Sequence, residues 1–189
     1  MLSAFARTAS RWDLTLFHAV NHDHGPLVDA MARAMGGRLV PALIMGTLAL
    51  AAAVLRRRTA LWSTCAVMLA FGATDSVGAR LLKPAMARVR PCYALPPGEV
   101  RQLVSISDSA GSLPSLHSAN SFATAAVIGV FAPVLAWPAL VLAAVIGWSR
   151  VVAGVHWPSD VWAGGVLGAG FGLLISALLA ALRRRLLAR

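Results

Sequence analysis

The chain has 189 residues, of which 58% are hydrophobic and only 13% are charged. Soluble domains carry about 25% charged residues and disordered chains have low hydrophobicity, so the composition excludes both classes. It predicts an integral membrane protein.

The net charge of +10 has a particular distribution along the chain. Sixteen of the 17 basic residues are arginine, and Lys83 is the only lysine. Two triplets, Arg56–Arg58 and Arg183–Arg185, each follow a long apolar run, which is typical of cytoplasmic helix ends. The charge therefore indicates membrane orientation, and we expect no nucleic-acid partner.

The first expected element is a short amphipathic helix over residues 12–20 that lies at the membrane interface. A turn over residues 21–25 follows it. The alternative is that residues 12–20 form a short sixth membrane span.

Five apolar runs could each cross about 30 Å of hydrocarbon as a helix. The first is short but can extend back through residues 27–35, and the last has glycines at four-residue spacing, which allow close helix packing. We therefore expect an all-α membrane bundle of five to six transmembrane helices, forming one domain over residues 1–189. The runs cover residues 39–55, 60–82, 119–137, 138–155 and 161–182, and the glycines are Gly164, Gly168 and Gly172.

Counting the spans places both arginine triplets on one side of the membrane. The loop over residues 83–113 and the connection over residues 150–159 then share the opposite side. Tryptophans are expected at the membrane boundaries, two at the inner one and two at the outer one. These are Trp62 and Trp137, and Trp157 and Trp162.

Polar residues follow the second span. Lys83 and Arg90-Pro91 stand at fixed spacing, with Arg88 between them. Three cations at one lip suit an anionic group, since arginine makes paired hydrogen bonds to phosphate oxygens. The alternative is that these side chains snorkel to lipid headgroups.

The third span opens with Pro114, Ser115 and His117. Pro114 suits the first turn of a helix, and a helix N-terminus presents unpaired N–H groups to an anion. Ser115 adds a hydroxyl, and His117 an imidazole that titrates near neutrality. The alternative is a capped helix with an interfacial histidine.

The fourth span ends with Arg150, followed by His156 and Asp160 four residues apart. A charge such as Arg150 is costly near membrane depth unless it faces partners or water. The carboxylate of Asp160 could orient the imidazole, and it could also cap the last helix. Together the three segments could transfer a phosphoryl group, with one histidine attacking phosphorus and the other protonating the leaving oxygen.

Other polar residues are set aside. His18, His22, Asp23 and His24 lack a convincing metal-ligand arrangement. Asp75, inside the second span, is a functional candidate by its position, but it is left out of the catalytic set. The alternatives are that it neutralises a basic residue such as Arg80 or Arg150, or that it faces a helix interface.

The motifs resemble those of the type 2 phosphatidic acid phosphatases, K-x6-R-P, P-S-G-H and S-R-x5-H-x3-D. The resemblance implies that His156 is the nucleophile, oriented by Asp160, and that His117 is the acid for the leaving group. It implies a phosphate site that needs no metal or cofactor, with Leu116 standing where the family has glycine. That site comprises Lys83, Arg90, Ser115, the Leu116 backbone and Arg150.

The resemblance further implies hydrolysis of a lipid phosphate or diphosphate in the bilayer, at the periplasmic face of an inner membrane. Undecaprenyl diphosphate is favoured, and a phosphatidylglycerophosphate, phosphatidate or lipid A phosphatase is the alternative. A non-enzymatic transport or lipid-binding protein is a more distant alternative, and a vanadate-dependent oxidase is disfavoured.

Overall fold

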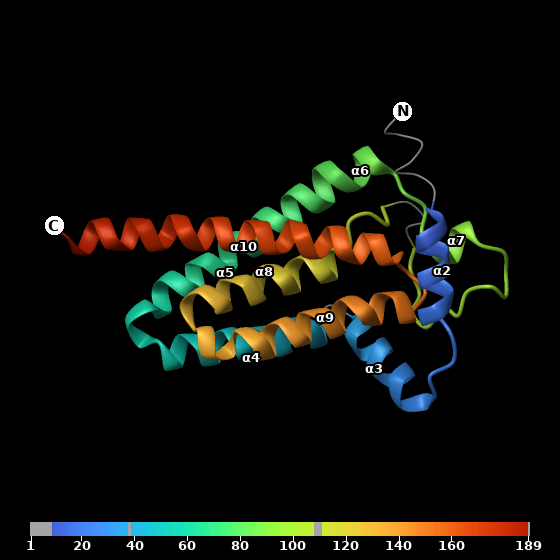
Figure 1. Ribbon diagram of the computed structural model, residues 1–189, viewed down its shortest axis with the longest axis horizontal. Coiled ribbons are helices and arrows are strands. Elements are labelled where there is room, and N and C mark those ends of the chain that lie inside the picture. Colours follow the sequence, from blue (N-terminus) through green and yellow to red (C-terminus); the bar gives the residue numbers. More distant parts are fainter. Residues whose placement is uncertain (1–8, 38, 108–110, 189) are drawn as a thin grey trace.

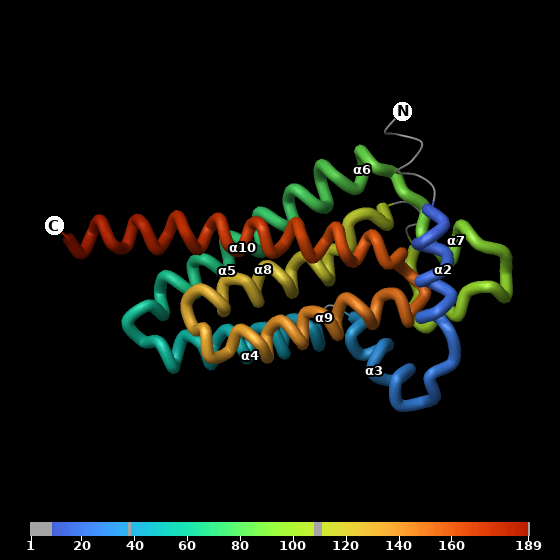
Figure 2. Tube along the Cα trace, viewed as in Figure 1, coloured from blue at the N-terminus to red at the C-terminus, as the bar shows by residue number. Residues whose placement is uncertain are grey.

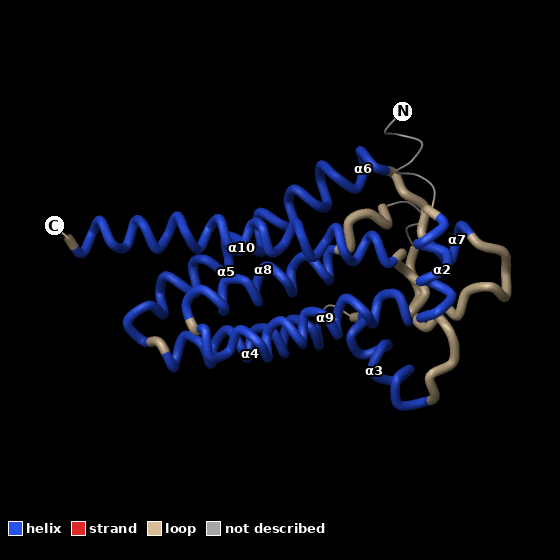
Figure 3. The backbone as a smooth tube through the Cα atoms, viewed as in Figure 1, coloured by secondary structure: helices blue, strands red, loops and turns tan. Residues whose placement is uncertain are grey.

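The computed structural model describes residues 9–37, 39–107 and 111–188, and within them every regular element is a helix. Five long helices run alongside one another, while short segments gather at one end of the bundle (Figures 1 and 3). This confirms the all-α membrane fold. The long helices are α4 (Leu39–Leu55), α5 (Ala60–Asp75), α8 (Leu116–Phe131), α9 (Ala136–Val152) and α10 (Pro158–Leu187).

The helices differ in how readily they could span a bilayer alone. Among the residues that the structure describes, three helical segments are long and apolar enough to do so, namely Arg57–Ala94, Pro133–Val152 and Pro158–Leu187. The helices α3 (Pro26–Gly36) and α4 qualify together as a fourth span, but they are bent by 78°. The apolar α8 has only 16 residues, and it is largely buried by other helices.

Residues 27–35 belong to α3, which Gly37 separates from α4 by an extended backbone, so they extend the first span only as one half of a bent pair. One predicted boundary was wrong. The third span ends at Phe131 rather than at residue 137, since Pro133 has no N–H for a continuing helix. Trp137 consequently lies in the first turn of α9, where it is exposed.

The amphipathic N-terminal segment is helix α2 (Arg11–Val20). It lies across the end of the bundle, close to the ends of α9 and α10 (Figure 1). Its ten residues reach only about 15 Å at 1.5 Å per residue, which is too short for a sixth span.

The central helix is α8, which packs against α4, α5, α9 and α10. Figure 2 shows α10 running beside it. A Cβ atom at Gly168 would lie 1.9 Å from the carbonyl oxygen of Ala119, and one at Gly172 would lie 2.5 Å from that of Ala123. The predicted close contact through the spaced glycines is therefore confirmed.

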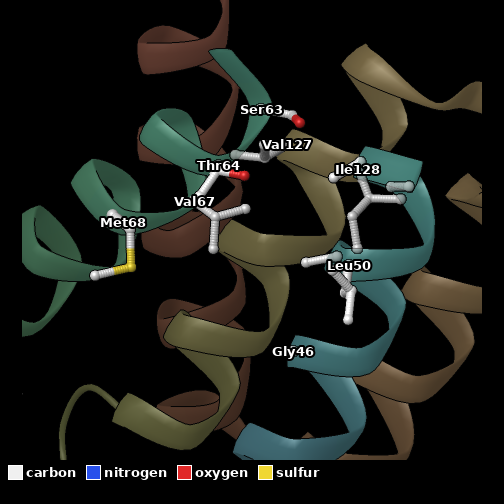
Figure 4. A pocket seen from close by; sticks show the side chains of 11 residues that line it. Gly46, Leu50, Ser63, Thr64, Val67, Met68, Val127 and Ile128 are labelled. Carbon is white, nitrogen blue, oxygen red and sulfur yellow. The ribbon is translucent and has the colours of Figure 1, made fainter. Parts of the chain in front are cut away.

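The two arginine triplets lie at the same end, as predicted, because Arg56, Arg57, Arg58 and Arg183 line one cavity of about 570 Å³. A second cavity of about 190 Å³ lies between α4, α5 and α8 (Figure 4). Its lining is mostly apolar and contains no residue of the three motifs.

We predict that Gly168→Ala lowers the melting temperature in detergent, because the added methyl group would overlap a backbone carbonyl of α8. Overpacking of this kind costs about 1–3 kcal/mol. The matched control is Gly170→Ala, since a Cβ atom there meets nothing within 4 Å. Equal melting temperatures for the two variants would contradict the close contact.

Candidate active site

The three motif segments meet at the end of the bundle opposite the arginine triplets. The first lies on α6 (Lys83–Met86) and α7 (Pro91–Ala94), the second at the start of α8, and the third between α9 and α10. A direct bond joins two of them, since the Ser115 N–H donates to the carbonyl oxygen of Asp160 over 3.0 Å.

His156 lies in the connection between α9 and α10, with 3% of its surface exposed. The Arg90 guanidinium donates to His156 Nε2 over 3.1 Å. Because arginine can only donate, Nε2 must carry the lone pair, and the proton of the neutral ring is on Nδ1. Nδ1 lies 3.4 Å from Asp160 Oδ2, so the carboxylate faces the protonated nitrogen and leaves Nε2 as the nucleophilic one.

Asp160 is fully buried at the first turn of α10. Its Oδ2 atom accepts hydrogen bonds from the Trp157 N–H, over 2.8 Å, and from the Ser112 hydroxyl. Its Oδ1 atom accepts from Arg88 over 2.7 Å. The bond from Trp157 belongs to the helix cap, so Asp160 both closes α10 and faces the imidazole.

The surroundings of His156 disfavour its charged form. Burial lowers the pKa of the imidazole to about 3, and the charges of Arg90 and Arg150 act in the same direction against the opposing effect of Asp160. The ring is therefore neutral at physiological pH, and its Nε2 lone pair accepts the hydrogen bond from Arg90.

Several buried polar atoms lack a hydrogen-bond partner in the described part of the chain, and two motif residues, Arg150 and Ser115, supply three of them. The others are Arg88 Nε, Asn120 Oδ1, His156 Nδ1 and Ser176 Oγ. Arg150 is 3% exposed, and its Nε and Nη1 atoms make no hydrogen bond; the hydroxyl of the fully buried Ser115 makes none either. Unsatisfied buried donors are costly, and a guanidinium especially so. An anion with several oxygen acceptors would satisfy them.

The first motif is joined to the others through a shared carbonyl. Lys83 Nζ donates to the Gly111 oxygen over 2.5 Å, and Arg90 Nη2 donates to the same oxygen over 3.3 Å. Arg90 also donates to the carbonyl oxygen of Val155 over 3.0 Å, next to His156. The structure therefore brings Arg90 to the segment that carries the imidazole, and Lys83 shares the Gly111 carbonyl oxygen with Arg90.

Leu116 replaces the family's glycine without backbone strain. Among the described non-glycine residues only Ala87 has a positive φ, so Leu116 needs no conformation reserved for glycine. Its side chain packs towards Gly78 in η2 (Ser76–Leu82), where a Cβ atom would lie 2.5 Å from Leu116 Cδ2. The glycine at 78 therefore accommodates the leucine at 116.

His117 lies in the first turn of α8 and is partly exposed. Its Nε2 donates to the carbonyl oxygen of Gly37, over 3.2 Å, between α3 and α4. The two histidines thus belong to different surroundings. His156 is enclosed by charged groups, whereas His117 borders the junction of α3 and α4.

Arg88 does not serve as a third cation for an anion at the lip. It is buried between two carboxylates, donating to Asp160 and, over 2.5 Å, to Asp13.

Trp157 does not lie at a membrane boundary as predicted. It is 1% exposed and packs against Phe17 with ring centroids 5.3 Å apart, whereas Trp162 is 73% exposed.

The carboxylate of Asp75 does not pair with an arginine. It accepts a hydrogen bond from Asn120, over 3.4 Å, and no ion pair to Arg80 or Arg150 is found in the described part of the chain. Within the same residues, no group of three or more His, Cys, Asp or Glu side chains is placed to bind a metal ion. His22 and His24 instead stack, with ring centroids 3.9 Å apart.

The sequence reasoning missed three residues that surround Asp160, namely Asp13, Ser112 and Ser159. Asp13 had a usable signal, because it stands four residues before Phe17 on one side of an amphipathic helix and is buried with it. Ser112 lies in a loop and Ser159 in the first turn of α10, and nothing in their spacing indicated their partners.

A family model described as the PAP2 superfamily matches residues 60–184, more than half of the chain. The chain belongs to the PAP2 superfamily. Membership confirms the resemblance seen in the motifs and makes the chain a phosphatase of a superfamily whose members act without a metal. A search of curated proteins gives no match.

Two solved structures resemble this PAP2 protein over nearly its whole length. LpxE of Aquifex aeolicus shares 24% identity with a TM-score of 0.65, covering 88% of this chain and 95% of its own. The PAP2-type phosphatidylglycerolphosphate phosphatase of Bacillus subtilis shares 25% identity with a TM-score of 0.66, covering 97% and 91%. Both similarities support the membrane phosphatase fold.

We predict that Gly78→Ala lowers both melting temperature and activity, because the new methyl group would meet Leu116 at the start of α8. The cost is at the low end of overpacking, about 1 kcal/mol, because the atom met is the far end of the Leu116 side chain, which can shift. Shortening the partner in Gly78→Ala/Leu116→Ala should restore much of both properties. The complementarity is contradicted if the double variant is as impaired as the single one.

A second prediction concerns pH and the His156 pKa. The unfolded pKa is about 6.5 and the folded pKa is about 3, so between these values the folded state binds fewer protons and loses stability as the pH falls. The loss at pH 5 amounts to about 2 kcal/mol. His156→Gln should therefore show a smaller fall in melting temperature between pH 7 and pH 5 than the wild type. His22→Gln, at an exposed position, is the control and should keep the wild-type dependence.

Proposed function

We propose that this PAP2 protein hydrolyses the phosphate or diphosphate of a membrane lipid through a covalent phosphohistidine at His156. The observation that carries the proposal is the set of unpartnered buried donors on Arg150 and Ser115 beside a neutral, oriented imidazole. These donors match a phosphate group in charge and in number of acceptors.

In the proposed first step, Nε2 of His156 forms a bond to phosphorus while the bond from phosphorus to the lipid oxygen breaks. His117 gives its proton to that oxygen, so that the lipid alcohol or phosphate leaves in a stable form. The Nδ1 proton stays on the ring, and Asp160 stabilises the positive charge that the phosphorylated imidazole gains. Lys83, Arg90 and Arg150 offset the charge on the phosphoryl oxygens.

In the second step, a water molecule attacks phosphorus, His117 accepts the water's proton, and the phosphorus–nitrogen bond breaks. Inorganic phosphate leaves, and both histidines return to their starting states. The N-terminus of α8, with Ser115 at the cap position, adds backbone donors for the phosphoryl oxygens.

Two lipid classes are candidate substrates. Undecaprenyl diphosphate is favoured by the small size and the compact loop over residues 83–113, which resemble those of bacterial enzymes of that kind. A phosphatidylglycerophosphate is supported by the Bacillus subtilis structure, whose title names that substrate. The arginine triplets lie at the opposite end from the site, and the positive-inside rule then favours an inner-membrane protein whose site faces the periplasm.

The test is phosphate release by the purified protein in detergent, without added metal, from undecaprenyl diphosphate, phosphatidylglycerophosphate, phosphatidate and lipid A in parallel. His156→Ala should abolish release, and His117→Ala should slow it roughly 10²- to 10⁴-fold. His24→Ala changes a histidine outside the motifs and should retain activity. With substrate labelled in its phosphate, the wild type should carry protein-bound label and His156→Ala should carry none.

Full activity in His156→Ala would refute the mechanism. A wild type that is inactive on all four lipids but transports one of them would favour the transport alternative.

A further inference from the structure

The catalytic end of the molecule contains a buried chain of charges that the three motifs do not include. It runs from Asp13 on α2 through Arg88, between α6 and α7, to Asp160 on α10. The three residues are 1%, 4% and 0% exposed, respectively. Buried charges persist only when paired and hydrogen-bonded, so this chain is a built feature of the fold.

The Asp13 carboxylate is fixed on both oxygens. Oδ1 accepts from the Ser159 N–H over 2.9 Å, while Oδ2 accepts from the Ser159 hydroxyl over 2.7 Å and from Arg88 Nη2. Ser159 Oγ in turn accepts from Arg88 Nη1 over 2.6 Å. Asp13 therefore holds the residue that immediately precedes Asp160, as well as the guanidinium that contacts Asp160.

The row of charges from Asp13 to Asp160 also determines how far the Asp160 carboxylate, which faces His156, is neutralised. One guanidinium is shared by two carboxylates, so Arg88 does not fully neutralise Asp160. If Asp13 lost its charge, Arg88 would neutralise Asp160 more completely and its Nη2 atom would lose its ionic partner. Asp160 would then stabilise a positively charged imidazole less well.

We propose that Asp13 is a positioning residue for catalysis, which acts through Arg88 and Ser159 to hold Asp160 in place and to keep Arg88 from fully neutralising the Asp160 charge opposite His156. The proposal rests on the proposed function, in which His156 is the nucleophile. It assigns a catalytic purpose to the surface helix α2, which also carries the exposed side chains Trp12 and Leu16.

The test is Asp13→Asn in the full-length protein, which keeps the size of the side chain and removes its charge. We expect kcat to fall roughly tenfold or more while KM changes less than about twofold, since Asp13 supports a catalytic group without touching substrate. Inhibition by vanadate, which mimics phosphorus while it is bonded to the histidine, should weaken by a similar factor. Inhibition by inorganic phosphate, which needs only the anion site, should stay unchanged.

A matched control separates this role from simple anchoring of α2. The Asn21 side chain, just after α2, donates to the carbonyl oxygens of Arg101, Val151 and Val152. Asn21→Ala should therefore lower the melting temperature, with kcat near the wild-type value well below that temperature. If Asp13→Asn does not fold, Ser159→Ala is the second variant, with an expected kcat loss of about 2- to 5-fold because the ion pairs remain.

A double-mutant cycle decides whether the effect passes through Asp160. In an Asp160→Asn background, adding Asp13→Asn should cause no further loss of kcat. Equal losses in both backgrounds, or a wild-type kcat for Asp13→Asn, would overturn the inference. Activity retained in His156→Ala would instead refute the proposed function, so the two failures are distinguishable.

Discussion

The outer end of the bundle depends on satisfying one fully buried carboxylate, that of Asp160. Its oxygens accept hydrogen bonds from Arg88, from the Ser112 hydroxyl and from the Trp157 backbone, which belong to three separate stretches of chain. A carboxylate without these donors would not remain charged at zero exposure. The same hydrogen bonds that offset the cost of its burial therefore hold these stretches of chain together. They also place Oδ2 of Asp160 3.4 Å from Nδ1 of His156.

Helix packing places the second motif segment, at the N-terminus of α8, beside this carboxylate. A Cβ atom at Gly164 would lie 2.4 Å from the carbonyl oxygen of Ser115, so glycine is needed exactly where α10 passes the cap of α8. At that distance the Ser115 N–H reaches the carbonyl oxygen of Asp160. The spaced glycines consequently do more than tighten a membrane bundle, because they place the N-terminus of α8 beside the start of α10.

The sequence predicted those features that depend on local pattern. Apolar runs located the long helices, arginine triplets located one end of the bundle, and motif spacing located the segments that meet at the other end. The partners of Arg88 could not be foreseen, since Arg88 and Arg90 are identical in type and only two positions apart. The backbone also changes direction before both arginines at a left-handed residue, Ala87 with φ of 44°, and an alanine carries no signal for that conformation. The bend between α3 and α4 likewise depends on tertiary packing against α9 rather than on apolar pattern.

The three buried arginines, Arg88, Arg90 and Arg150, differ in the partners that offset their charge. Arg88 is neutralised by two carboxylates, and Arg90 donates to a backbone carbonyl and to the imidazole. Arg150 retains two guanidinium nitrogens without a hydrogen-bond partner in the described part of the chain. Because a buried charge is stabilised mainly by an opposite charge close to it, an anion gains most beside Arg150 and least beside Arg88. Asp13 and Asp160 thus neutralise Arg88 and hold it in place. The positive charge that no carboxylate compensates is that of Arg150, which is available for a phosphate bound at His156.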